Sequence, residues 1–289
     1  MPIFFINTFL FALAAFLIDS LQDFGKFSPG ALLMLYAVYL LYFAVFCNLT
    51  LIVSALSKNS SIALVILLGI WMLSCLGAPK AAANFADALY PYPSRQEFLA
   101  EVNKDKEKGL NGHNPWSKEA QQLEKEVLKK YKVDSLSQLP FNFDGYLMQK
   151  GEEHEAEIFF KHYALLKAQY QNQSTIYRAL AWVSPFLPTR FLSMAIAHTD
   201  YQAHWNFADA AEKYRVALQK ALNDNFAENS KYGDWEYQAD KSLWKSIPKF
   251  SYEPPSLGFI LQENLSNLIV LLFWLGVSFA GLYFISQKL

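Results

Sequence analysis

The sequence has little charge for its length. Charged residues make up 18% of the chain, against about 25% in a typical soluble domain, and hydrophobic residues make up 53%. Lys and Arg together number 25 and Asp and Glu 26, so the chain lacks the excess of positive charge that binding to a nucleic-acid backbone requires. We therefore expect no nucleic-acid partner.

Cysteine and the common catalytic motifs are also scarce. The two cysteines, Cys47 and Cys75, lie inside apolar runs, so the polar part of the chain has no cysteine for a disulfide or a zinc site. The sequence contains no Gly-Lys-Ser/Thr phosphate loop, no Gly-x-Ser-x-Gly elbow and no Cys-His nucleophile pattern. We predict neither enzymatic activity nor a metal or other cofactor.

The charges are unevenly distributed, because almost all of them lie between Lys80 and Glu253. A helix needs about 17–25 apolar residues to cross a bilayer. Four stretches outside the polar region satisfy that length, namely 2–18, 31–56, 61–77 and 265–285. We predict an all-α membrane protein with about four transmembrane helices. Three of them lie in residues 1–78, a helical extracytoplasmic domain occupies 79–262, and the last helix with a short cytoplasmic tail occupies 263–289.

The first stretch has an alternative interpretation as a signal peptide, since Ala12, Leu13 and Ala14 resemble a small-residue cleavage site. Against it, the basic segment that normally precedes such a peptide is missing, and two further apolar stretches follow at once.

The short loops predict the orientation, because basic residues near span ends favour the cytoplasmic side. Lys58, between the second and third stretches, and Lys288, in the tail, have no acidic neighbour. The opposite side carries Asp19 and Asp23 with Lys26, and Glu263 before the last stretch. Both termini are therefore expected in the cytoplasm and the polar domain outside.

The polar domain has helical signals throughout. Ser94 and Glu97 form a capping box that opens a short helix, which Gly109 would close. A second helix is expected from about Asn114 to Lys132. Two longer helices follow, over about 146–183 and around 207–221, and each carries an apolar seam with steps of three and four residues. Their similar pattern predicts an antiparallel hairpin.

Residues 182–197 between the two long helices are nearly all apolar but contain Pro185, Pro188 and Arg190. We predict a turn that lies on the outer leaflet or against the spans. A buried loop in the core of the helical domain is the alternative.

One segment gathers the densest set of potentially chemical side chains, which are His198, Thr199, Asp200, His204, Asp209 and Glu212. On a helix, Asp200 and His204 would share a face, as a metal site requires, but no third ligand accompanies them at a recognisable spacing. We favour a structural or interaction role, with Thr199 or Asp200 capping the next helix.

The second apolar stretch carries polar side chains on a helical spacing, namely Tyr36, Tyr39, Tyr42 and Asn48. Such a stripe either packs against a neighbouring helix or lines a substrate path, and we favour packing.

Several segments carry a family resemblance, namely 131–145, 151–153, 184–195, 198–201 and 208–215. Together they resemble the extracytoplasmic domain of bacterial ABC transporter permeases of the type-2 class, with a distant similarity to the permease of the nitrous-oxide-reductase maturation system. The junction over 54–64 is similar to the cytoplasmic turn between two late spans of that class. The resemblance implies a permease subunit in the bacterial inner membrane, which works with a separate cytoplasmic ATPase and with itself or a sister permease.

The chain departs from that class in one respect. Permeases of this class usually have six spans and an early cytoplasmic segment that docks the ATPase, whereas this sequence is expected to begin at the third span. The alternative function is therefore a membrane-anchored extracytoplasmic binding or scaffold protein without transport activity.

Overall fold

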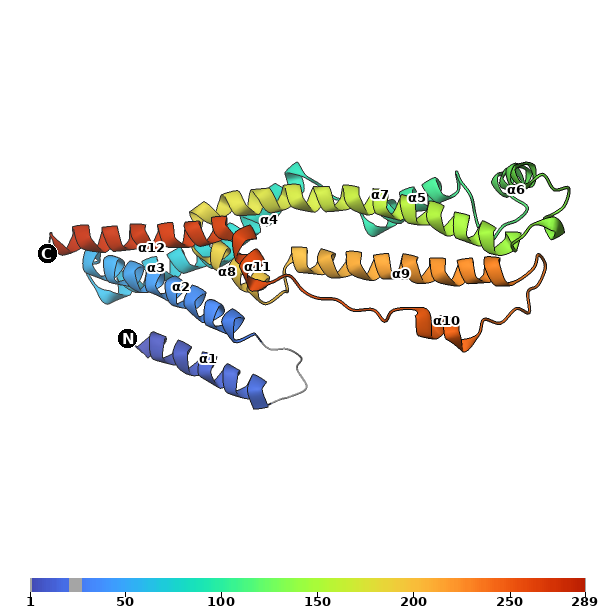
Figure 1. Ribbon diagram of the computed structural model, residues 1–289. Coiled ribbons are helices and arrows are strands. Elements are labelled where there is room, and N and C mark those ends of the chain that lie inside the picture. The colour runs from blue at the N-terminus through green and yellow to red at the C-terminus, as the bar shows by residue number, and fades with distance from the viewer. Residues whose placement is uncertain (1, 21–27, 289) are drawn as a thin grey trace. The chain divides into compact units, whose positions relative to one another are not determined.

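The computed structural model describes residues 2–20 and 28–288, and every regular element in this part of the chain is a helix (Figure 1). The predicted all-α fold class is confirmed. Asp23 and Lys26, which contributed to the predicted orientation, lie outside the described residues.

The chain divides into two compact units. We call the first the membrane unit; it comprises Met1–Pro91, Gln171–Asn206 and Glu253–Leu289. We call the second the polar unit; it comprises Tyr92–Tyr170 and Phe207–Tyr252. The predicted boundaries at residues 78 and 262 stay a prediction.

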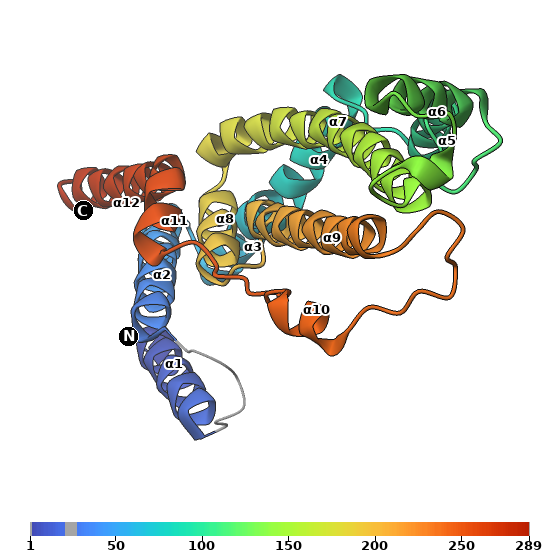
Figure 2. The same ribbon diagram turned by 45° about the vertical axis from the view of Figure 1, so that its right-hand side comes forward.

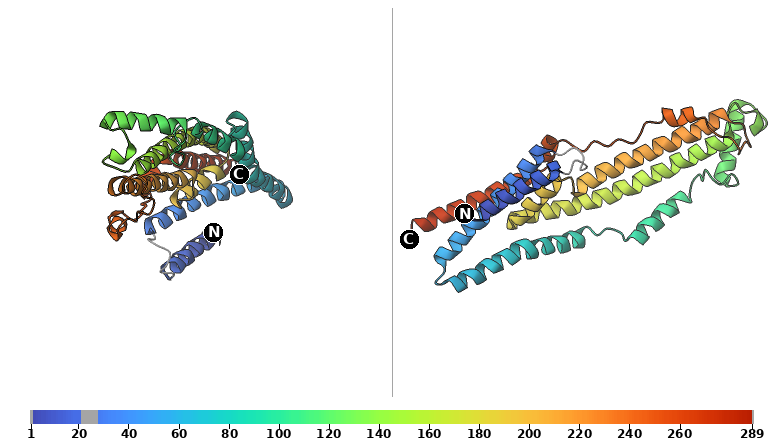
Figure 3. Two further views of the ribbon diagram at one scale, coloured as in Figure 1. Left: turned by 90° about the vertical axis from the view of Figure 1, so that its right-hand side faces the viewer. Right: turned by 90° about the horizontal axis from the view of Figure 1, so that it is seen from below.

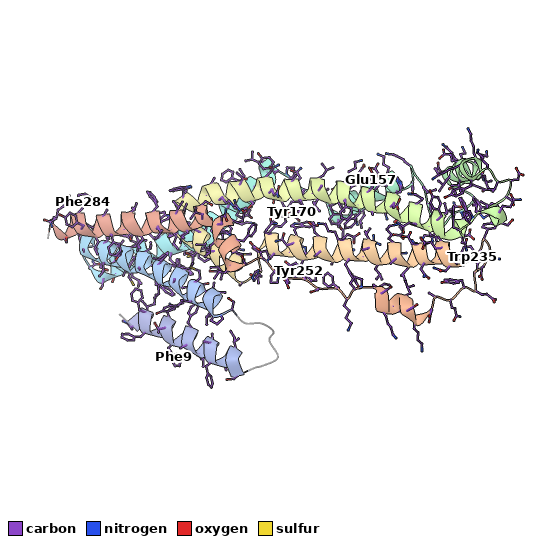
Figure 4. All side chains as sticks on the ribbon, viewed as in Figure 1. Phe9, Glu157, Tyr170, Trp235, Tyr252 and Phe284 are labelled. Atoms are coloured by element: carbon purple, nitrogen blue, oxygen red, sulfur yellow. The ribbon has the colours of Figure 1, made fainter. Side chains whose placement is uncertain are left out.

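Three helical segments of the membrane unit are long and apolar enough to cross a bilayer. They are α2 (Pro29–Leu56, 28 residues), the continuous segment Ser60–Leu89 (30 residues) and α12 (Leu265–Ser286, 22 residues). The first apolar stretch forms α1 (Pro2–Ser20), whose apolar part Pro2–Ile18 is shorter than the other three. Phe9 on α1 and Phe284 on α12 are 65% and 66% exposed, and Figure 4 shows both side chains projecting from their helices. Such faces are suited to contact with lipid or another apolar helix.

The segment Ser60–Leu89 extends further than predicted. It consists of α3 (Ser60–Met72), a π-helical turn (Leu73–Gly77) and α4 (Ala78–Leu89), whereas the sequence predicted an end at Gly77. Pro79 lacks a backbone N–H and would break an uninterrupted α-helix. The wider π turn just before it accommodates this defect, so the helix continues.

A helix replaces the predicted turn at 182–197. A short 3₁₀ turn (Ala181–Val183) leads into α8 (Phe186–Ile196), with Pro185 at the cap and Pro188 in the first turn, where a missing N–H has no helical partner to lose. Leu192 of α8 is 1% exposed and packs in one cluster with Val38 of α2 and Leu271 of α12. The segment therefore lies against the spans, as one of the two alternatives expected, but as a helix.

The short helices of the polar unit follow their caps. The α5 helix (Arg95–Lys106) begins at the predicted capping box, in which Ser94 N donates to Glu97 Oε2 at 2.8 Å. The α6 helix (Lys118–Tyr131) begins later than the predicted Asn114, because Ser117 Oγ accepts from Ala120 N at 3.1 Å and is the true cap.

The two long helices, α7 (Phe143–Leu180) and α9 (Tyr201–Asn229), run antiparallel where both belong to the polar unit (Figures 1 and 2). Near one end Asn223 Nδ2 donates to Gln149 Oε1 at 3.3 Å, and further along the pair Lys167 forms an ion pair with Asp209. The predicted hairpin is confirmed within this unit.

The aromatic seams of the hairpin have partners on other segments. Tyr163 of α7 lies 5.1 Å from the ring of Phe98 on α5. Phe207 of α9 lies 5.9 Å from the ring of Phe250 and 5.3 Å from that of Tyr252. The chain after α9 turns back along this helix and, apart from α10 (Lys241–Ser246), has no regular structure up to Tyr252 (Figure 3). It then enters α11 (Leu257–Glu263).

Candidate functional site in the membrane unit

A buried hydrogen bond joins two spans of the membrane unit. Asn48 Nδ2 of α2 donates to Ser278 Oγ of α12 at 3.0 Å, and the two residues are 7% and 2% exposed. A polar pair in such an apolar setting fixes which helix faces meet, because an unpaired amide there would be costly.

Two of the predicted tyrosines contact α1. The Tyr36 hydroxyl lies 2.7 Å from Thr8 Oγ1, and its ring lies 5.4 Å from that of Phe11. The Tyr39 ring lies 6.0 Å from that of Phe11.

The third tyrosine contacts two other elements. The Tyr42 hydroxyl lies 3.6 Å from Cys75 Sγ in the π turn, and its ring lies 6.5 Å from that of Phe186 on α8. The three tyrosines therefore pack against three different elements of the membrane unit, and Asn48 of the same stripe bonds a fourth, α12. The alternative, that these residues also line a substrate path, stays untested.

A serine that the sequence interpretation missed holds the π turn in place. Ser184, fully buried before α8, donates from Oγ to the carbonyl of Ser74 at 2.8 Å and accepts from Phe186 N at 3.2 Å. One side chain thus satisfies a carbonyl in the irregular turn and the start of α8. The sequence feature that could have indicated this role is the position of Ser184, directly before Pro185 and at the end of a predicted long helix.

The segment His198–Asp200 forms the corner between α8 and α9. Thr199 N donates to Met194 O at 2.8 Å and His198 N to Ala195 O at 3.1 Å, which are the two bonds of a Schellman motif. His198 occupies the left-handed position of that motif with φ 52°. The sequence interpretation did not predict this helix end, because a histidine occupies the position where glycine is usual.

Asp200 begins the next helix. Its Oδ1 accepts from Ala203 N at 2.9 Å, as an N-cap side chain does. His204 is exposed, and its ring lies 5.6 Å from that of Trp205. Asp200 and His204 thus share the first turns of α9, with the carboxylate engaged at the cap.

The remaining two residues of the predicted cluster belong to the polar unit and have partners there. Asp209 pairs with Lys167, and Glu212 pairs with Arg215 at 2.9 Å. The hydrogen bonds that Arg215 donates to the Glu212 carboxylate raise the pKa of the Arg215 guanidinium. The six residues therefore do not converge on one point, and no group of three or more potential metal ligands occurs among the residues that the structure describes.

A pocket of about 450 Å³ opens beside this corner in the membrane unit. Two helices and the loop before α11 supply its lining, which consists of Gln202, Asn206, Pro255, Phe259 and Glu263. The sequence interpretation used Glu263 only to orient the chain. The sequence did contain a feature of the site, because Gln202 and Asn206 on α9, and Phe259 and Glu263 on α11, are each four residues apart and so share a helix face.

In the polar unit, one carboxylate lies beside two lysines and a histidine. Asp105 of α5 lies 2.9 Å from Lys108 Nζ, 3.1 Å from Lys161 Nζ and 2.9 Å from His162 Nε2. The bonds from Lys108, His162 and Lys161 hold the pKa of Asp105 well below its usual range. This cluster links α5 to α7, and the Asp105 carboxylate has its partners within the protein.

Comparison with known proteins identifies one family. A family model described as a domain of unknown function, DUF3526, matches residues 95–253, which is more than half of the chain. No curated protein and no solved structure matches the chain. The matched region includes the polar unit except residues 92–94 and, from the membrane unit, the corner between α8 and α9. The chain therefore belongs to the DUF3526 family.

Proposed function

We propose that this protein is a membrane-spanning permease subunit of a bacterial ABC transporter, which works with a separate ATPase and a second permease copy. The observation that carries the proposal is the insertion of the family domain, residues 95–253, between two span-length helices. The resemblance of segments such as 184–195 and 198–201 to type-2 permeases supports it.

The proposed location is the inner membrane, with the family domain outside and both termini in the cytoplasm. Lys58, in the loop between α2 and α3, and Lys288, after α12, support this orientation through the distribution of basic residues.

Thiol labelling in intact cells tests the orientation, after Cys47 and Cys75 have been replaced by Ala. A Ser60→Cys variant should react only with a membrane-permeant reagent. A Glu107→Cys variant, at an exposed position after α5, should react with an impermeant reagent. Labelling of position 60 by the impermeant reagent would overturn the orientation.

Purification and reconstitution test the function. The full chain, tagged after Leu289 and extracted from native membranes, should bring with it a nucleotide-binding ATPase. That ATPase should hydrolyse ATP several-fold faster or slower once the chain is added back in lipid. An ATPase rate unaffected by the chain, together with isolation of the chain alone, would contradict the proposal and favour the anchored scaffold.

A further inference from the structure

The pocket beside the α8–α9 corner is built from two facing pairs of side chains. Gln202 and Asn206 are four residues apart on α9, and Phe259 and Glu263 are four residues apart on α11, so each pair presents one helix face. Pro255 completes the lining. A volume of about 450 Å³ lies within the range of small-molecule sites.

The chemistry of this lining favours a cation. Glu263 is the one charged residue that lines the pocket, and no basic side chain lies within ion-pair distance of it in the described part of the chain. Gln202 Nε2 donates to Asn206 Oδ1 at 2.9 Å, which turns one amide donor away from a ligand and leaves Gln202 Oε1 as an acceptor. The lining thus offers oxygen acceptors from Glu263 and from Gln202.

The aromatic ring adds a second attraction for positive charge. Phe259 is 50% exposed although it lines the pocket, so its ring is accessible to a ligand. The face of an aromatic ring attracts a cation, and a carboxylate nearby reinforces the attraction. A primary ammonium group suits this lining, because its positive charge is attracted by the ring face and its three N–H groups donate to carboxylate and amide oxygens. A quaternary ammonium could use only the ring and the charge.

The pocket also lies next to a helix that is long and apolar enough to cross a bilayer. Glu263 is the last residue of α11 and precedes Leu265, the first residue of α12, by two positions. The α11 helix is held in place by Ile260, which is 7% exposed and packs with Val38 and Leu271 of the spans. A bilayer crossed by α12 would therefore have its headgroups close to Glu263.

We propose that this pocket binds a primary ammonium group, carried either by phosphatidylethanolamine or by a soluble amine. The proposal does not depend on ATPase coupling or on the side of the membrane that the family domain occupies.

Native mass spectrometry of the full chain tests the proposal, with release from nanodiscs that contain equal parts of phosphatidylethanolamine, phosphatidylcholine and phosphatidylglycerol. The wild-type chain should retain phosphatidylethanolamine or, if the source is soluble, bind added ethanolamine. Glu263→Gln should weaken the binding about tenfold, since it removes a charge-assisted hydrogen bond. Glu253→Gln, the same change at an exposed acid outside the pocket, should bind like the wild type.

The two ligands distinguish the source. Retention of phosphatidylethanolamine without binding of ethanolamine identifies a lipid site, whereas binding of ethanolamine by the chain in phosphatidylcholine nanodiscs identifies a soluble amine. In either case Phe259→Leu should weaken binding while the melting temperature without ligand stays within a few degrees of the wild type. Equal retention of all three lipids with no binding of ethanolamine, or binding that survives Glu263→Gln unchanged, would overturn the proposal.

Discussion

Asn48 and Ser278 lie 230 positions apart in the sequence and share a buried hydrogen bond of 3.0 Å between α2 and α12. Ser278 Oγ also donates to Leu275 O of its own helix at 2.8 Å, so its hydroxyl proton is used and its oxygen is free to accept from the asparagine. The pair thus joins the first and last of the three span-length helices, which precede and follow the family domain in the sequence.

Removing this bond should lower stability by a modest amount. Asn48→Ala and Ser278→Ala, alone and together in the full chain, should give a coupling free energy of about 0.6 kcal/mol, with an upper end near 1.7 kcal/mol, as for other hydrogen bonds between membrane helices. Denaturation in mixed micelles measures it. Thr50→Ala serves as the control, because Thr50 is exposed on α2 and, among the described residues, its hydroxyl bonds the carbonyl of Phe46 in its own helix. Strict additivity of the two substitutions would contradict a direct interaction.

A second prediction concerns the close approach of two glycines in the polar unit. A Cβ on Gly151 of α7 would lie 2.3 Å from the backbone N of Gly112, an atom that cannot move aside alone. Gly151→Ala should therefore cost about 1–3 kcal/mol or more, despite the better helix propensity of alanine. Gly258→Ala is the control, since nothing lies within 4 Å of a Cβ there and the change should be neutral or stabilising. A melting temperature for Gly151→Ala equal to that of the wild type would show that the two backbones are not in contact.

The elements with local signals were predictable from the sequence. The capping box at Ser94 and Glu97 located the start of α5, because the two side chains satisfy backbone groups of their own helix, although the helix ends at Lys106, before the predicted Gly109. The period of the apolar residues likewise located α7 and α9. Such signals depend on neighbours in the chain and need no knowledge of the fold.

Features that depend on distant partners were not predictable. Pro79 reads as a helix end, but a buried hydroxyl from Ser184 supports the π turn that lets the helix continue. An apolar seam indicates that a helix face is buried but does not indicate which segment covers it. The contact between the rings of Tyr163 and Phe98 therefore could not be predicted. The pocket combines α9 with α11, and the sequence alone could not bring those faces together.

Acid should destabilise the protein through Asp105. Its pKa is lower in the folded protein than its unfolded value of about 3.9, because Lys108, His162 and Lys161 bind the charged form. The unfolded chain therefore takes up this proton first as the pH falls. The stabilisation is complete above about pH 4 and is lost as the pH drops toward the folded-state pKa.

Melting temperatures between pH 7 and pH 3 check this. Asp105→Asn should melt below the wild type at pH 7, and the difference should shrink at pH 3. Asp134→Asn, at an exposed position, should follow the wild-type curve throughout. A constant difference between Asp105→Asn and the wild type across the whole range would show that the contribution of Asp105 does not depend on its charge.

His198 should be replaceable by glycine with a gain in stability. Its φ of 52° is strained for a residue with a Cβ, and glycine removes about 1 kcal/mol of that strain. His198→Gly should therefore raise the melting temperature, whereas His198→Ala, which keeps the Cβ, should leave it nearly unchanged. A fall in melting temperature for both variants would instead indicate that the imidazole itself has a partner.

Asp200 should act through its cap and not through a metal. Asp200→Asn should be mild because asparagine caps about as well, whereas Asp200→Ala should cost about 1 kcal/mol by leaving the amide of Ala203 without its acceptor. Asp87→Ala, at an exposed position on α4, is the control for loss of an acid from the same unit. The full chain should melt at the same temperature with zinc, with manganese and with a chelator. A metal-dependent rise in melting temperature that Asp200→Asn or His204→Gln abolishes would replace the cap by a metal site, because a ligand that binds only the folded state stabilises it.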